Sequence, residues 1–385
     1  MNNTANQAVR TFEELHGHTP HGVWSAPGRV NLIGEHTDYN DGLVLPLAIP
    51  QRTQVAASPR TDGLLTLASI GRDTLVAEPL RVADLRPGSV TGWPAYPAGV
   101  AWVLAERGLS TGGADLVISG DVPTGAGLSS SAALECVVAL TLTGLAGVEL
   151  PLGELARIAQ RAENDFVGVP CGILDQTASL SCTDGHALFY DVRSGQAEQV
   201  PLDMAAAGLS LLVIDTRVQH ALGETGYGDR RRGCEKAAVE LRVPSLRSIE
   251  PADLASSLDR LPAELVPLVR HVVTENARVD TVVRLLRAGR VAEIGDALTA
   301  SHVSLRDDYR VSCAELDLAV DAALAAGALG SRMTGGGFGG SAIALVPADA
   351  RQAVSAAVAQ AFADRDLAEP RQFTVLASAG AGRDD

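Results

Sequence analysis

The stretch Gly120–Leu140, GDVPTGAGLSSSAALECVVAL, decides the fold, because a loop of glycine and serine runs directly into an apolar segment. Gly125 and Gly127 allow positive φ and a close approach of the backbone to a ligand. From Ala132 onward, apolar residues recur at helical spacing. The free N–H groups in the first turn of such a helix attract anions, above all phosphates. A helix capped by serine after a glycine turn is the alternative interpretation.

Composition limits the protein class. The chain has 385 residues and 46% hydrophobic content, which suits two domains with separate cores. The net charge of −15 argues against a nucleic-acid partner and an anionic membrane surface. The polar N-terminus predicts no signal peptide, and no apolar segment is long enough to span a membrane. The five cysteines form no CxxC pair, so we expect no zinc site or disulfide framework, and a cytoplasmic location.

The basic residues exclude two types of nucleotide site. Lys236 is the only lysine, and it lies in the helical-looking segment RRRGCEKAAVELR. The chain therefore has no GxxxxGK[ST] loop and no protein-kinase strand lysine. A dinucleotide-binding fold is poorly supported, because the glycine loop lies in mid-chain and has serine in place of the third glycine. Nucleotide phosphates would have to be held by backbone amides, hydroxyls and a metal.

The pattern along the chain predicts an α+β fold with two lobes, residues 1–195 and 196–385, and a cleft between them. In the first lobe, short strands precede a helix that ends at Gly108 and two further helices, and residues 178–202 alternate like a hairpin. In the second lobe, a strand at LSLLVIDT precedes a mostly helical stretch from Asp229 to Val303. SRMTGGGFGGSAIALV predicts a glycine turn into a strand, and the end predicts a strand with a loose tail.

Two segments concentrate chemically active side chains. In APGRVNLIGEHTDYNDG, Ala26–Gly42, carboxylates and an imidazole lie within a few residues, as expected of a binder of hydroxyl groups. An ordinary solvated turn is the alternative, and a metal site fits less well. In AENDFVGVPCGILDQTASL, Ala162–Leu180, the carboxylate of Asp175 has apolar neighbours and is either a helix cap or a tuned acid or base.

Two further segments are less specific. TGGGFGGSA, Thr334–Ala342, indicates backbone pressed against another loop or a ligand, or simply a tight hairpin. In HALGETGYGDRRRGCEKAA, Tyr227 stands before an arginine run, and we expect Arg230–Arg232 to form a solvated helix start.

Together these segments resemble the GHMP small-molecule kinase superfamily and, within it, the galactokinase family. GRVNLIGEHTDYNDG resembles the galactokinase motif over its full length, and PTGAGLSSSAA and TGGGFGGSA resemble the second and third superfamily motifs. PCGILDQ and GYGDRRRGCE match further stretches, in family order across nearly the whole chain. The resemblance implies a two-lobed GHMP-kinase-like fold with mixed sheets. It also implies phosphorylation of the anomeric hydroxyl of α-D-galactose by ATP, the first step of the Leloir pathway.

The resemblance implies residue roles by motif position. Asp175 matches the catalytic base and Arg29 its partner. The implied sugar-binding residues are Glu35, His36, Thr37, Asp38, Gly172, Asp175 and Tyr227. The residues implied to surround ATP are Gly125, Ala126, Gly127, Leu128, Ser129, Ser130 and Ser131, with Ser69 and Trp93 on the nucleotide side. Ser131 and Glu163 match the Mg²⁺ ligands, which suits a hard cation that prefers oxygen.

Several alternatives stay open. Asp175 either abstracts the hydroxyl proton or mainly orients the hydroxyl while Arg29 stabilises the charge. The sugar could instead be N-acetylgalactosamine or arabinose, and a non-catalytic sugar-sensing protein could share the fold. Ser131, Ala132, Glu163 and Asp175 are retained, which favours catalysis. We expect a monomer whose partners are galactose and ATP.

Overall fold

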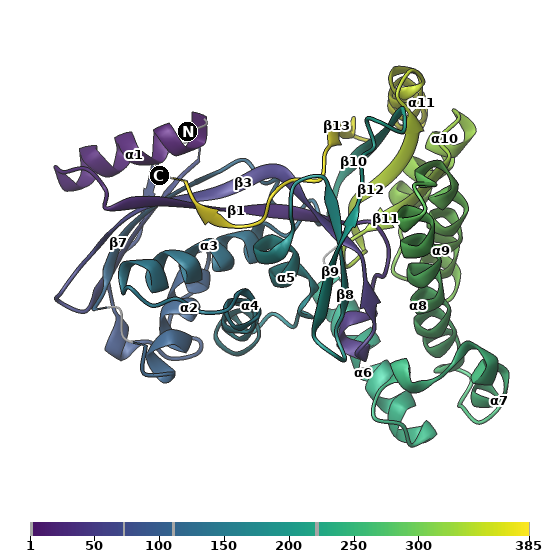
Figure 1. Cartoon of the computed structure of the whole chain (residues 1–385), viewed down its shortest axis with the longest axis horizontal. Helices are drawn as coiled ribbons and strands as arrows, with labels where there is room; N and C mark the ends of the chain where they lie inside the picture. The colour runs from purple at the N-terminus through teal and green to yellow at the C-terminus, as the bar shows by residue number, and fades with distance from the viewer. Residues whose placement is uncertain (1–2, 72–73, 110–111, 220–222, 385) are drawn as a thin grey trace.

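Residues 3–71, 74–109, 112–219 and 223–384 are described by a computed structural model. Figure 1 shows two lobes, the first holding the N-terminus and the second the helices of the C-terminal half. Within the described part of the chain, no helix combines the length and apolarity needed to cross a membrane. The two lobes contain both sheets and helices, as predicted from the sequence.

The first lobe is built on a mixed seven-stranded sheet of order β14-β1-β3-β7-β4-β5, with β6 beside β4. β4 and β7 run parallel, whereas β1 pairs antiparallel with β3 and β3 with β7. The strands are β1 (Gly22–Asn31), β3 (Pro46–Pro59), β4 (Leu64–Ile70), β5 (Thr74–Val76), β6 (Leu80–Arg81), β7 (Ala114–Gly120) and β14 (Gly382–Arg383).

Both faces of this sheet are covered, because successive side chains of β3 pack into cores on opposite faces. Val55 and Ala57 pack into the core beneath the helices α2 (Ala95–Glu106) and α3 (Ser130–Leu145). Ala56, between them, packs with Phe12 of the helix α1 (Asn3–His16) on the opposite face. α2 ends just before Gly108, whose φ of +73° is easily adopted by glycine, as predicted.

The last of the three helices expected in the first lobe, over LGELARIAQRAENDFVG (residues 152–168), is not uniform. It consists of α4 (Leu152–Arg161) and a π-helical turn over Ala162–Val167, which ends at Gly168. The wide turn carries Glu163, and α5 (Leu174–Ser181) follows after a short loop. π-Helical turns inside helices are frequent at functional sites.

A small antiparallel sheet lies beside the junction of the lobes. It contains β2 (Leu43–Val44), β8 (His186–Asp191) and β9 (Gln196–Pro201) in the order β2-β8-β9. β8 and β9 form the predicted hairpin.

The second lobe contains a four-stranded sheet of order β11-β12-β10-β13. Its strands are β10 (Leu209–Gln219), β11 (Gly330–Thr334), β12 (Gly339–Pro347) and β13 (Arg371–Val375). Its helices are α6 (Gly223–Leu241), α7 (Leu254–Leu258), α8 (Val266–Arg287), α9 (Gly295–Asp307), α10 (Ala314–Ala325) and α11 (Arg351–Ala363). The predicted helical stretch and the predicted glycine turn are both present.

The two lobes share hydrophobic core. On β10, Leu212 and Ile214 pack with the helices of the second lobe, whereas Leu211 and Val213 share a core with Leu32 of the first. The hydrophobic core is thus continuous between the two lobes. The division into residues 1–195 and 196–385 stays a prediction.

The expected loose tail is wrong. β14 pairs with β1, and the hydroxyl of Ser25 donates to Asp384 Oδ1 at 2.7 Å. Arg52 holds the connecting segment by donating to the carbonyls of Ala379 (2.8 Å) and Gly380 (2.6 Å). Figure 1 shows this yellow segment returning from the second lobe to the first. Sequence reasoning missed it because the strand is very short and its partner is distant.

Candidate active site

A cavity of about 170 Å³ lies where the two lobes meet. It brings together most of the residues predicted for catalysis and sugar binding, although they come from β1, the loop after it, the start of α5 with the turn before it, and α6. They are Arg29, Glu35, His36, Asp38, Gly172, Asp175 and Tyr227. The cavity is also lined by Asn31, which was not among the predicted site residues, and by Gly335 and Gly336 of the predicted TGGGFGGSA segment.

Asp175 lies in the first turn of α5, yet its carboxylate does not cap that helix. Arg29 contacts Oδ1 through Nε at 2.9 Å and Nη2 at 2.6 Å, and Ser129 Oγ donates to Oδ2 at 2.6 Å. Arg29 also donates through Nη1 to the carbonyl of Gly127 at 2.6 Å. The carboxylate is thus held in one orientation and tied to the glycine loop.

The glycine loop contains three residues with positive φ, one of which is not glycine. Gly125 and Gly127 have φ of +74° and +71°, as expected, and Ser129 has φ of +60°, which is unfavourable for a residue with a Cβ. The serine cap is therefore wrong: Ser129 precedes α3 but forms no side-chain cap, because its hydroxyl turns to Asp175. Ala126 and Leu128 bury their side chains in the core and offer only backbone to a ligand.

The third motif supports this loop from the second lobe. The hydroxyl of Ser341 donates to the carbonyl of Ala126 at 2.7 Å. A Cβ on Gly335 would lie 2.9 Å from the carbonyl oxygen of Gly127, so only glycine fits that approach. Both predictions for TGGGFGGSA hold, since it turns between β11 and β12 and also presses against another loop.

Glu35 is 3% exposed and is held by groups from both lobes. Its Oε2 accepts from Asn31 Nδ2 at 2.7 Å and from Arg332 Nη2 at 2.5 Å. Its Oε1 accepts from the backbone N–H of Gly335 at 2.9 Å. Burial raises the pKa of Glu35, and the neighbouring Arg332 guanidinium opposes that rise.

Arg332 was missed by sequence reasoning. It is fully buried, and it also donates to the carbonyls of Asn31 and Leu32 and to Ser301 Oγ. A second buried carboxylate, Glu275, lies 3.8 Å from Arg332 Nη2 and pairs with Arg278 at 2.7 Å. No local signal pointed to it, because SRMT before the glycine turn contains a single apolar residue, Met333, and does not have the pattern of a buried strand.

His36 has a positive φ of 63° and both ring nitrogens engaged. Its Nε2 lies 3.2 Å from the carbonyl oxygen of Gly336, which can only accept, so Nε2 carries the proton. Its Nδ1 then accepts from the hydroxyl of Tyr39 at 2.8 Å. Burial, followed by the neighbouring His271, lowers the pKa of His36 to about 3, so the ring is neutral at physiological pH. The ring of Tyr227 packs against it in a tilted arrangement, with ring centroids 5.4 Å apart and an interplanar angle of 42°.

Asp38 and Gly172 meet at the wall of the cavity. Asp38 accepts from the backbone N–H of Leu174 at 3.2 Å and of Tyr39 at 3.0 Å. A Cβ on Gly172 would lie 1.6 Å from Asp38 Oδ2, so glycine is required there. Burial, followed by the charge of Asp175, raises the pKa of Asp38.

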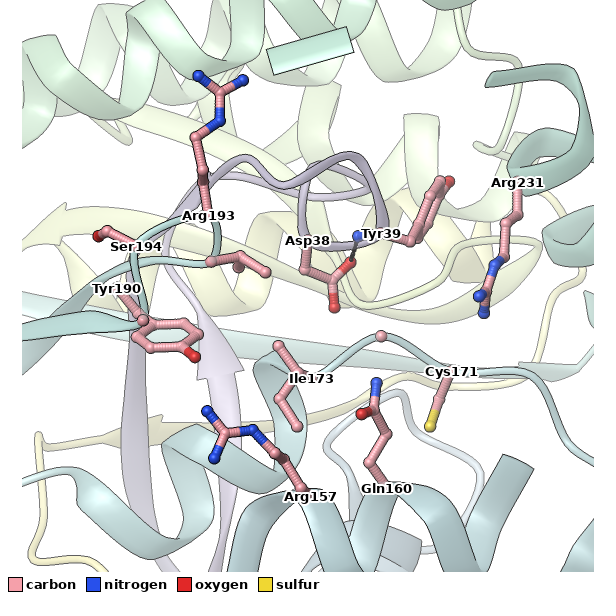
Figure 2. A pocket seen from close by; sticks show the side chains of 13 residues that line it. Asp38, Tyr39, Arg157, Gln160, Cys171, Ile173, Tyr190, Arg193, Ser194 and Arg231 are labelled. Carbon is pink, nitrogen blue, oxygen red and sulfur yellow. Dashed lines mark hydrogen bonds between the residues drawn. The ribbon is translucent and has the colours of Figure 1, made fainter. Parts of the chain in front are cut away.

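The same wall borders another cavity, of about 360 Å³. Figure 2 shows Asp38 facing this space, with Arg157 and Tyr190 on one side and Arg231 on the other, while Arg193 points away. The segment that contains Cys171 and Gly172 separates it from the first cavity. Asp38 therefore lines both cavities.

A cavity of about 430 Å³ lies on the far side of the α3 N-terminus. Four of the residues that line it were predicted for the nucleotide side: Ser69, Trp93, Ser130 and Ser131. Ser69, Trp93 and the pair Ser130–Ser131 lie far apart in the sequence, and the fold brings them together.

Beside Ser131 lies a pair of buried carboxylates. Gln176 Nε2 donates to Glu163 Oε2 at 2.9 Å and lies 3.4 Å from Glu135 Oε2. Burial raises the pKa of Glu163, while a hydrogen bond from Ser131 opposes that rise. Burial, followed by the charge of Glu163, raises the pKa of Glu135 well above its usual range. Glu135 follows Ser131 by one helical turn and was not predicted.

Two expectations are not met. Thr37 is fully buried, and its hydroxyl lies 2.8 Å from the carbonyl oxygen of Gly34 and 2.7 Å from that of Leu43, so it shapes the loop instead of lining the cavity. Arg230 is not solvated like the rest of the arginine run, because it donates to the carbonyls of Tyr309 (2.5 Å) and Arg310 (3.0 Å).

Comparison with known proteins agrees with this arrangement. Residues 10–59 match the galactokinase galactose-binding signature, residues 95–183 the GHMP kinases N terminal domain and residues 282–364 the GHMP kinases C terminal family. A galactokinase of Streptomyces coelicolor is 56% identical over 97% of this chain and 96% of its own length. A galactokinase of Chloroflexus aurantiacus is 46% identical over 96% of this chain and 95% of its own.

Solved structures give the same result. The fold superimposes on Lactococcus lactis galactokinase complexed with galactose with a TM-score of 0.91 and 33% identity, covering 98% of this chain and 99% of that one. A mevalonate kinase of L. major, at 20% identity and a TM-score of 0.62, shares the fold; the match covers 94% of this chain and 99% of that one.

Proposed function

The chain belongs to the galactokinase family of GHMP kinases, and we propose that its central cavity phosphorylates the anomeric hydroxyl of α-D-galactose with ATP, the first step of the Leloir pathway. One observation carries the residue assignment. Asp175 lines the sugar-sized cavity, and Arg29 and Ser129 hold its carboxylate. Ser129 belongs to the glycine loop, and Arg29 donates to the carbonyl of Gly127 in that loop. Acceptor and donor sites thus meet at one carboxylate.

Asp175 and Arg29 form the reaction centre in this proposal. With the sugar bound, the C1 hydroxyl would donate its hydrogen to Asp175. Arg29 would face the oxygen on which negative charge develops, where a fixed cation is most effective. Arg29 is buried, with a side chain 7% exposed, so its charge is only weakly screened by water. Phosphoryl transfer depends mainly on such positioning and charge neutralisation.

The phosphates of ATP fit the loop Gly125–Ser131. With no P-loop lysine in the sequence, the free amides at the start of α3 and the hydroxyls of Ser130 and Ser131 are the available donors. Ser69 and Trp93 line the adjoining cavity and suit the nucleoside. We propose that ATP spans from that cavity to the loop.

Ser131 and Glu163 suit a magnesium ion. Glu163 is 5% exposed, and among the described residues it has no ion pair with a basic side chain, so a buried carboxylate lacks a counter-charge. Oxygen donors of this kind fit Mg²⁺, which would neutralise charge on the phosphates. Ser131 and Glu163 would hold it, and Gln176 orients the carboxylate from behind.

The test is a coupled ADP assay with galactose, its 2-deoxy and 2-acetamido analogues, arabinose, and no sugar. We expect ADP release that depends on galactose. Preference for the 2-acetamido sugar or arabinose would reassign the substrate, and sugar binding without ADP release would indicate a sensor.

Asp175→Ala should abolish turnover while ATP still binds, as measured by calorimetry. Wild-type rates in a correctly folded variant would remove the assignment. Asp175→Asn separates the two roles of the carboxylate, because the amide can orient a hydroxyl but is a poor base; substantial residual activity would favour orientation.

A cytoplasmic location and a monomeric state complete the proposal. All five cysteines are free thiols, as is usual in a reducing compartment. Light scattering of the purified protein tests the monomer.

A further inference from the structure

We infer that the side-chain carbonyl of Asn31 is an additional sugar-binding group, which accepts a hydrogen bond from a ring hydroxyl other than the one at C1. This inference rests on the proposed function, since the C1 hydroxyl is placed at Asp175. It adds a residue to the site and assigns it a single atom, Oδ1.

The position of Asn31 directs its side chain to the cavity. It is the last residue of β1, is 1% exposed and lines the cavity. Arg29 and Asn31 pair in regular register with Ala48 and Pro46, so their side chains leave the same face of the strand. Arg29 reaches Asp175 from that face, and Asn31 follows one pleat further along.

The orientation of the amide is determined by its neighbour. Asn31 Nδ2 donates to Glu35 Oε2 at 2.7 Å, and a carboxylate that is ionised can only accept. A flipped amide would place two acceptors face to face, so Oδ1 must point the other way. Oδ1 is buried and has no hydrogen-bond partner within the described part of the chain.

The rest of Asn31 is already engaged. Its backbone N–H donates to Thr334 Oγ1 at 3.2 Å, and its carbonyl accepts from Arg332 Nη1 at 3.1 Å. Buried polar groups are rarely left unpaired in native proteins, and each exception requires an explanation. An acceptor that is completed only when the substrate enters explains this one.

Glu35, the expected acceptor in this region, has little capacity left. Its two oxygens offer about four acceptor positions. Asn31, Arg332 and Gly335 occupy three of them, and Thr334 Oγ1 lies 3.3 Å from Oε1. A sugar hydroxyl that needs an acceptor here therefore finds a free one on Asn31, with Glu35 and Arg332 holding that amide in place.

The ligand group must be a neutral donor. A cation is disfavoured because Arg29 and Arg332 are close, and a purely acceptor group would face Oδ1 unfavourably. A hydroxyl meets both conditions. The chemical class is thus a polyhydroxyl sugar, and recognition by Oδ1 requires that one particular hydroxyl be present.

The test is a thermodynamic cycle between the protein and the substrate. Wild type and Asn31→Ala are each measured with galactose and with its 2-, 3-, 4- and 6-deoxy analogues, as kcat/KM and as Kd by calorimetry. In wild type, loss of the recognised hydroxyl should lower kcat/KM about 5- to 10-fold, whereas in Asn31→Ala the same loss should cost about 2-fold or less. The other analogues should show equal losses in both proteins.

Asn31→Ser repeats the cycle if the alanine variant is unstable. Asn276→Ala is the matched control, because Asn276 is a buried asparagine outside the cavity whose amide accepts from Leu43 N at 2.7 Å and donates to Val272 O at 2.8 Å. It should show no coupling to any hydroxyl. Equal losses with every analogue in wild type and both Asn31 variants would overturn the inference. Wild-type turnover of galactose, measured alongside, tests the proposed function separately.

Discussion

Replacing Arg332 by methionine tests how much the site depends on a buried charge. The side chain is fully buried, and it donates to Glu35, Ser301 and two backbone carbonyls. Methionine keeps much of the volume but leaves Glu35 without a cation and two carbonyls without that donor. Breaking a buried ion pair by removing one partner costs about 3–5 kcal/mol. Glu275 keeps Arg278 and should be less affected.

The pH dependence identifies the cause of that loss. Burial already raises the pKa of Glu35 above its usual 4.5, and without Arg332 it rises further. A carboxyl whose pKa is higher in the folded than in the unfolded protein is neutral in the fold at low pH and costs little there. Its ionisation destabilises the fold as pH rises through the folded-state pKa. The difference between variant and wild type should therefore shrink as pH falls from about 7 to about 5, by up to about 1.4 kcal/mol per pH unit.

The measurement is denaturant unfolding followed by circular dichroism at several pH values. Arg287→Met is the matched control, since Arg287 also makes a double contact with a glutamate, Glu198, but the two side chains are 45% and 49% exposed. It should cost less than about 1 kcal/mol. A loss in Arg332→Met below about 1 kcal/mol, or a larger one that is independent of pH, would refute the reasoning. In the same variant, kcat/KM for galactose should fall about 10- to 100-fold.

Substitutions at three further positions make separate predictions. Gly172→Ala should raise KM for galactose about 10-fold or more with ATP binding unchanged, because the new Cβ would lie 1.6 Å from Asp38 Oδ2; an unchanged KM contradicts this. Ser129→Gly should lower kcat about 10-fold by removing the donor to Asp175. Ser129→Ala should lower kcat equally and should also unfold about 1 kcal/mol more easily than Ser129→Gly, since a residue with a Cβ is unfavourable at a φ of +60°. The free energy of unfolding of His302→Asn should rise relative to that of wild type as pH falls from 6.5 toward 4, by up to about 1.4 kcal/mol per pH unit. Burial lowers the pKa of His302 to about 4, so the stability of wild type is full above 6.5 and is lost below; a constant difference in unfolding midpoints would disprove it.

Local signals explain what could be predicted from the sequence. The glycine loop, the helix after it and the glycine turn near residue 337 depend on neighbouring residues, because positive φ and helical periodicity are local properties. The site residues in the long first motif were found by resemblance, and most of them line one cavity. Thr37 failed because a motif position does not say whether a hydroxyl points to a ligand or to its own loop.

The missed features depend on contacts between distant segments. Arg332 meets Glu35 across 297 positions, and no local pattern links them. The role of Ser129 was misjudged because its alternative partner, Asp175, lies 46 positions away. The sequence around Asn31 did not indicate a binding residue. Only its contacts in the fold show that Nδ2 donates to Glu35 and that Oδ1 has no partner within the described residues.

The return of β14 to β1 also bears on how the protein is made. Ser25 and Asp384 are joined across 359 positions, so during synthesis on the ribosome the sheet begun by the earliest strand stays open at one edge until the second lobe has emerged. Truncation before residue 382 would expose that edge of β1, including the Trp24 ring on which Arg383 lies at 5.0 Å. The sheet of the first lobe is thus completed only after β14 has been translated.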